Sequence, residues 1–68
     1  MKWQDEYREL KVGSLVGYTA KCINTYSYSE VMSKRNGVII SEEPMNREVH
    51  WHDGEKTWEY VKNLEVLA

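Results

Sequence analysis

The chain has 68 residues, a formal net charge of −2 and a sequence pI near 5.6. A chain of this length forms one domain at most and buries a small core, which argues against the large clefts that most enzymes use. Proteins that bind duplex nucleic acid usually have a basic face and a high pI, so the charge disfavours that class as well. We therefore expect a single non-enzymatic domain, residues 1–68, that binds a partner and needs no cofactor.

The aromatic residues are three Trp and five Tyr, with no Phe. Because both types carry a polar atom that needs a partner when buried, they suit half-buried sheet faces and binding surfaces. The single cysteine, Cys22, cannot form an internal disulfide, which predicts an intracellular setting. No segment has the apolar run of a signal peptide or of a membrane span, so we expect neither secretion nor membrane insertion.

The N-terminal segment, residues 1–10, has apolar side chains at helical spacing. Trp3, Tyr7 and Leu10 are separated by four and then three residues, which indicates one face of a short helix. A helix this short is marginal in water, so it must pack on the rest of the domain or on a partner, or else it frays.

A strand is expected next, after a bend at Gly13. Val16, Tyr18 and Ala20 alternate with other residues and would share one strand face. Residues 21–36 then lack a sustained period of either kind. We interpret them as a long loop that contains a short irregular hairpin.

A second strand is predicted after the turn signal Asn36-Gly37. Residues 38–41 form a β-branched run, which suits a strand buried on both faces. Residues 42–46 include two adjacent acids and the only proline. They are therefore expected to form an exposed turn.

The strongest hairpin signal is Asp53-Gly54, which lies between two stretches of alternating polarity. If these two residues form the turn, Val49 lies opposite Trp58. Val49, Trp51 and Trp58 then share one buried face, although a bulged turn would shift this register by one residue.

The C-terminal stretch completes the predicted order of elements. Residues 60–63 have the length of one helical turn, and residues 64–67 can form a closing edge strand. The order of strand, long loop, three more strands, single turn and last strand is typical of an SH3-like barrel. We expect an all-β, five-stranded SH3-like barrel over residues 11–68.

Two segments also resemble a known family. Residues 49–54, Trp58, Val61 and residues 64–67 fit V-x-W-x-D-G-x-x-x-W-x-x-x-x-x-L-E-V-[LI], and residues 11–16 are similar to K-V-G-D-L-V. This pattern resembles small, mostly uncharacterised SH3-like proteins of tailed marine bacteriophages. The resemblance implies a virion or accessory phage component, located in the host cytoplasm or the virion. The loop at residues 21–36 is longer than in that pattern.

The candidate partner-binding residues all lie in the long loop: Tyr26, Tyr28, Met32, Lys34 and Arg35. Long loops in compact domains tend to be functional, and exposed tyrosines supply rigid contact area. We expect the tyrosines to bury against a protein partner, with Lys34 and Arg35 at the polar rim. Alternatively, the aromatic side chains fold back and cover the end of the barrel.

The second function considered is binding of single-stranded nucleic acid through the loop at residues 21–36. Bases would stack on Tyr26 and Tyr28, beside Lys21, Lys34 and Arg35. The acidic C-terminal half opposes this function. It remains the alternative to a protein partner.

His50 and His52, near Glu48 and Glu55, suggest a metal site at first sight. Structural zinc requires four ligands, and no further pair with suitable spacing is present. We interpret these residues as a solvated strand face and expect no metal.

An aromatic cage for a methylated lysine could use Trp51, Trp58, Tyr60 and Glu59. The predicted hairpin instead places both tryptophans in the core. The cage is therefore the weaker interpretation.

Overall fold

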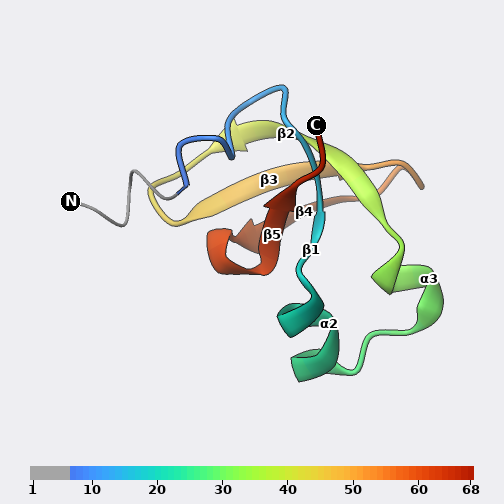
Figure 1. Ribbon diagram of the computed structural model, residues 1–68. Helices are drawn as coiled ribbons and strands as arrows, with labels where there is room; N and C mark the ends of the chain where they lie inside the picture. The colour runs from blue at the N-terminus through green and yellow to red at the C-terminus, as the bar shows by residue number, and fades with distance from the viewer. Residues whose placement is uncertain (1–6) are drawn as a thin grey trace.

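The computed structural model describes residues 7–68, which form an antiparallel sheet of five strands with the spatial order β4-β3-β2-β1-β5 (Figure 1). The sheet is open, with β4 and β5 as its edges. The strands are β1 (Leu15–Tyr18), β2 (Asn36–Glu42), β3 (Asn46–Trp51), β4 (Lys56–Tyr60) and β5 (Leu64–Val66). The expected all-β class and its five strands are confirmed at this level.

Two short helices occupy the stretch between β1 and β2, and both lie at the end of the sheet where β1 finishes (Figure 1). They are α2 (Ala20–Tyr26) and α3 (Glu30–Ser33). Hydroxyl groups cap both: Thr19 accepts from the Cys22 amide at 3.1 Å, and Ser29 accepts from the Met32 amide at 3.2 Å. The predicted hairpin in residues 21–36 is therefore wrong, and Ala20 begins a helix instead of extending the first strand.

The hairpin of β3 and β4 is confirmed, but its register differs from that of a two-residue turn. Val49 lies opposite Thr57 instead of Trp58. Gly54 adopts a φ of 95°, and its amide donates to the Trp51 carbonyl at 2.9 Å, so the connection is one residue longer and bulged. Trp58 consequently lies on the face opposite Trp51: the exposed fractions are 48% for Trp58 and 1% for Trp51.

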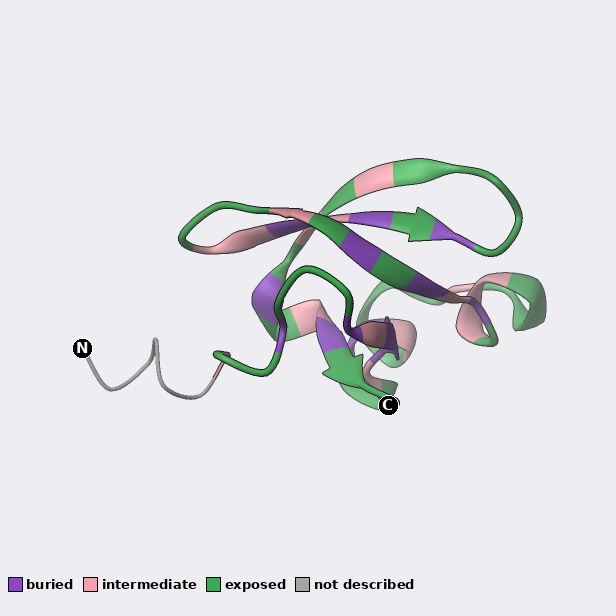
Figure 2. Cartoon of the chain, turned by 90° about the horizontal axis from the view of Figure 1, so that it is seen from above, coloured by how far each residue is buried: buried purple, intermediate pink, exposed green. Residues whose placement is uncertain are grey.

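One face of the sheet packs on the core, and burial alternates along the long strands (Figure 2). In β2, Ile39 is fully buried, whereas Val38 and Ile40 on the other face are exposed. The prediction that this strand is buried on both faces is wrong. The core consists of Leu10, Val16, Tyr18, Cys22, Ile39, Val49, Trp51, Val61 and Leu64.

The predicted turn at residues 42–46 and the single helical turn before the last strand are both confirmed. Glu43 and Asn46 exchange backbone hydrogen bonds, and the 3₁₀ helix η1 (Val61–Asn63) separates β4 from β5. Within residues 7–68, no helix combines the length and the apolar character that crossing a membrane requires.

The predicted N-terminal helix falls largely on residues 1–6, including Trp3, which lie outside the described residues. At residues 7–10 the chain turns, and the Leu10 amide donates to the Tyr7 carbonyl at 2.9 Å. Leu10 is buried, Tyr7 packs against the core, and the buried guanidinium of Arg47 donates to the Leu10 carbonyl. This end of the described chain is thus attached to the sheet.

Candidate binding pocket between α2 and η1

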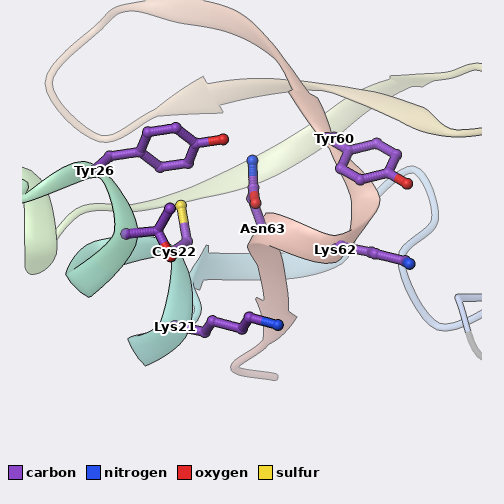
Figure 3. A pocket seen from close by; sticks show the side chains of 7 residues that line it. Lys21, Cys22, Tyr26, Tyr60, Lys62 and Asn63 are labelled. Carbon is purple, nitrogen blue, oxygen red and sulfur yellow. The ribbon is translucent and has the colours of Figure 1, made fainter.

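A pocket of about 230 Å³ lies between α2 and η1 (Figure 3). Ligand sites for whole small molecules typically measure about 300–1,000 Å³, so this one fits a single ring or side chain with its polar group. Its lining residues are Lys21, Cys22, Thr25, Tyr26, Tyr60, Lys62 and Asn63.

Two features of the local sequence bring these side chains together. In α2, Lys21 and Thr25 are four residues apart and therefore lie on the same side of the helix. Cys22 and Tyr26 form a second pair of this kind, directly beside the first. On the other side, the Thr19 amide donates to the Asn63 carbonyl at 2.9 Å. This bond attaches the start of α2 to η1 and sets the distance between the two walls.

The pocket carries two positive charges. Lys21 and Lys62 are exposed, and neither forms an ion pair with any of the residues 7–68. Their side chains extend toward the same side in Figure 3, below the rings of Tyr26 and Tyr60, which lie on either side of Asn63. Cations and aromatic rings therefore border one concave surface.

Cys22 forms part of the pocket floor and is 3% exposed. Burial raises the pKa of the Cys22 thiol above its usual value, and the Glu59 carboxylate acts in the same direction. The thiol therefore stays protonated near neutral pH and is a weak nucleophile.

A continuous series of aromatic contacts leads from the pocket into the core. The Tyr26 ring stacks on Tyr28, with 5.7 Å between centroids and 25° between planes. Tyr28 contacts Tyr18 at 4.9 Å, and Tyr18 stacks on Trp51 at 4.7 Å. Because Tyr26 is 57% exposed while its neighbour is fixed against the core, its ring is a rigid platform at the surface.

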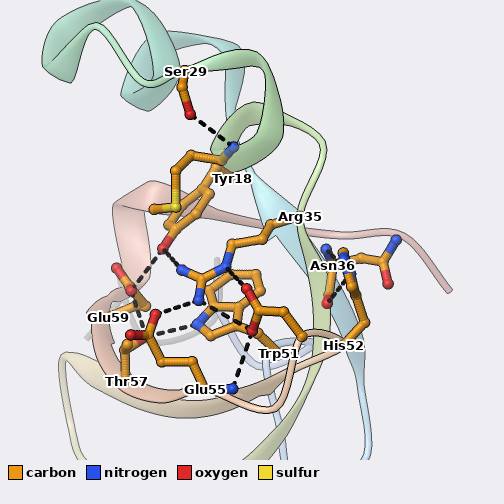
Figure 4. Close-up of polar contacts among 11 residues, drawn as sticks. Tyr18, Ser29, Arg35, Asn36, Trp51, His52, Glu55, Thr57 and Glu59 are labelled. Atoms are coloured by element: carbon orange, nitrogen blue, oxygen red, sulfur yellow. Dashed lines mark hydrogen bonds and ion pairs between the residues drawn. The ribbon is translucent and has the colours of Figure 1, made fainter.

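Arg35 lies at the inner end of this series (Figure 4). Its guanidinium stands 4.8 Å from the centroid of the Trp51 ring. Its Nε donates to Asp53 Oδ2 at 3.1 Å, Nη2 donates to Glu55, and Nη1 approaches the Tyr18 hydroxyl at 3.5 Å. These bonds attach the beginning of β2 to the turn between β3 and β4.

The polar groups around Tyr18 are also satisfied. The Tyr18 hydroxyl donates to Glu59 Oε2 at 2.9 Å, and the Thr57 hydroxyl donates to the same oxygen at 2.6 Å. The Trp51 indole donates to the Thr57 oxygen at 2.7 Å. Burial, followed by the Glu59 carboxylate, raises the pKa of Tyr18, so its hydroxyl remains a donor at all ordinary pH values.

The structure does not bring the five residues predicted for partner binding to one surface. Tyr26 and Lys34 are exposed, whereas Tyr28 and Met32 are partly buried against the core. Arg35 is 4% exposed, so the expected position of this residue at a polar rim is wrong. Only Tyr26 belongs to the pocket.

Sequence reasoning missed the other wall of the pocket, which is Tyr60, Lys62 and Asn63, because that wall arises from tertiary packing. The helices themselves had a detectable signal. Thr19 and Ser29 each precede a short segment without Gly or Pro, as N-cap residues do.

The remaining candidate sites are explained by the fold. Among the described residues, no three His, Cys, Asp or Glu side chains group as metal ligands would. His50 is exposed on the sheet, and His52 lies in the hairpin turn, with its Nδ1 3.2 Å from the Asn36 carbonyl. Trp51 and Trp58 lie on opposite faces, so they cannot line one aromatic cage.

Comparison of the chain with protein-family models, with curated proteins and with solved structures finds no match.

Proposed function

We propose that the protein is a non-enzymatic interaction module of the SH3-like class, of the kind found in phages, and that it binds a protein partner during assembly. The strand order, with β5 returning beside β1 after a 3₁₀ turn, supports the SH3-like assignment. The motif resemblance supports a phage setting. The partner would be another virion protein or a host protein.

The observation that carries the proposal is the exposure of Tyr26 on a fixed support. Tyrosine side chains that are held rigid before binding lose little conformational entropy in a complex. Val31 in α3 is 78% exposed and adds apolar area on the same inserted segment between β1 and β2. The segment therefore offers both an aromatic anchor and an apolar contact for a protein partner.

A capture experiment tests this surface. Tagged wild-type protein is incubated with dissociated virions of a phage that encodes the chain and, separately, with a lysate of the host cells. Retained proteins are identified by mass spectrometry. We expect the double variant Tyr26→Ala, Val31→Ser to lose the retained protein, because both changes remove exposed contact area.

The matched control is Val12→Ser, which removes an exposed apolar side chain (56%) from the loop before β1. This variant should retain the partner, and thermal unfolding should show similar stability for all three proteins. Equal capture by wild type and the double variant would refute the proposed surface. Absence of the chain from intact virions, with capture of a host protein, would refute the assembly role.

A further inference from the structure

We propose that the pocket between α2 and η1 binds one nucleotide unit, with the base stacked on Tyr26 and the phosphate near Lys21 and Lys62. This is a second binding activity that shares Tyr26 with the protein contact proposed above, so the lysine variants, which keep Tyr26, distinguish the two activities. The pocket combines residues from two walls that are about forty positions apart in the sequence.

The first argument is the arrangement of rings. Tyr28 packs against Tyr26 from the side of the core, and the remaining exposed surface of the Tyr26 ring borders the pocket. Tyr60, 41% exposed, stands on the other side of Asn63 (Figure 3). Stacking on such rings stabilises any base, because every base has a π-face.

The second argument is charge. The ammonium groups of Lys21 and Lys62 have no acidic partner among residues 7–68, although the protein as a whole is acidic. The Glu59 carboxylate, which acts electrostatically on the Cys22 thiol, already accepts hydrogen bonds from Tyr18 and Thr57. A phosphate is thus attracted by two cations, while the neighbouring carboxylate is engaged elsewhere.

The third argument is size. A volume of about 230 Å³ admits one flat ring and leaves its charged group near the pocket mouth. The Asn63 side-chain amide can donate to or accept from the edge of that ring. An acidic peptide would use the lysines but would leave the tyrosine faces without a stacking partner, so a nucleotide is the better match.

Fluorescence anisotropy with a labelled thymidine oligonucleotide of about ten residues tests the proposal, since single-strand sites commonly span about 4–16 nucleotides. The decisive variant is Lys21→Met, Lys62→Met. Its control, Lys11→Met, Lys56→Met, removes the same charge from exposed lysines outside the pocket. We expect the pocket variant to lose at least about tenfold in affinity and the control less than about twofold.

Two further measurements separate a specific pocket from general charge attraction. One phosphate neutralised at the pocket predicts a loss of only about threefold in affinity between about 50 and 200 mM salt. Tyr26→Trp should retain binding because it keeps a stacking surface, whereas Tyr26→Ala should weaken it by about five- to 100-fold. Circular dichroism confirms that each variant is folded.

Free thymidine monophosphate distinguishes the two sources of this ligand. A single-strand site is indicated if the affinities for both probes fall equally in the Lys21→Met, Lys62→Met variant and the oligonucleotide binds more tightly than the free nucleotide. Binding of the free nucleotide alone indicates a nucleotide site and also supports the proposal. Failure of both probes to bind at low salt, equal effects of the pocket and control variants, or preferential binding of polyglutamate would overturn it.

Discussion

The guanidinium of Arg35 lies over the indole of Trp51, with 4.8 Å between the Arg35 Cζ atom and the ring centroid. The Arg35 side chain is 3% exposed, whereas the carboxylates that it binds, Asp53 and Glu55, are 42% and 60% exposed. The cation is therefore buried beneath its anions and keeps its charge, because the hydrogen bonds to Asp53 and Glu55 raise its pKa against the opposing effect of burial.

Replacing Arg35 should destabilise the fold. Arg35→Met removes several charge-assisted hydrogen bonds and leaves Asp53 and Glu55 without their partner, with an expected loss of about 2 kcal/mol in the free energy of unfolding. Urea denaturation measures the change. The neighbouring Lys34→Met is the control, because Lys34 is exposed and its ion pair with Glu30 contributes less than about 1 kcal/mol. Equal effects of the two substitutions would contradict the structural role of Arg35.

The same ion pair predicts a pH dependence. Hydrogen bonding to Arg35 lowers the pKa of Asp53 below its ordinary value of 3.8. Since the pKa is depressed in the folded state, this contribution to stability is fully present above the unfolded-state pKa and is lost as the pH falls through the folded-state pKa. Urea denaturation as a function of pH should show this decline below about pH 4.

Asp53→Asn provides the control for that experiment. Its amide oxygen can still accept from the Glu55 amide, as Asp53 Oδ1 does at 3.0 Å, but the side chain no longer titrates. The difference in stability between wild type and variant should shrink on acidification. A constant difference would show that Asp53 is not linked to Arg35 in solution.

The two tryptophans of the hairpin should differ strongly in their contribution to stability. Trp51→Ala removes a buried ring that contacts Tyr18 and Arg35, at an expected cost of about 3–5 kcal/mol. Trp58→Ala removes a ring that is 48% exposed and should cost less than about 1 kcal/mol. Chemical denaturation of both variants tests the observed register, because the two-residue turn would make the two costs similar.

Gly37 should tolerate no side chain. A Cβ atom at this position would lie 2.6 Å from the His50 carbonyl oxygen and 2.9 Å from the Trp51 Cα atom. Because these are backbone atoms of the paired strand, Gly37→Ala should cost about 1–3 kcal/mol or prevent folding.

Gly13→Ala is the comparison for that substitution, since nothing lies within 4 Å of its Cβ position and only its φ of 98° opposes the change. It should cost about 1 kcal/mol, and thermal unfolding would rank the two variants. The reverse ranking would contradict the close pairing of β2 with β3.

The sequence predicted the number and order of the strands because turn residues and alternation mark them locally. It did not predict the hairpin register: Asp53-Gly54 is compatible with two connections that differ by one residue, and this difference moves Trp58 to the opposite face. The sequence did not predict the burial of Arg35 either. An arginine in a polar stretch resembles a surface residue, and its acidic partners, Asp53 and Glu55, come from another part of the chain.

Only part of the candidate site could be predicted from the sequence, because one of its two walls comes from a distant element. Tyr26 and Lys21 belong to the loop that the sequence singled out, and both border the pocket. Tyr60 and Lys62 reach the pocket because η1 turns back toward α2, which no local pattern encodes.

The position of Arg35 also couples two distant parts of the chain. It lies one residue beyond Lys34, the C-cap of α3, and it holds the tip of the hairpin through Asp53 and Glu55. A partner that draws α3 outward must therefore either stretch these contacts or carry the hairpin tip with it. Binding of a partner at α2 and α3 would then alter the hairpin turn that follows β3. The backbone amides around residue 54 would exchange hydrogen at a different rate when the partner is bound.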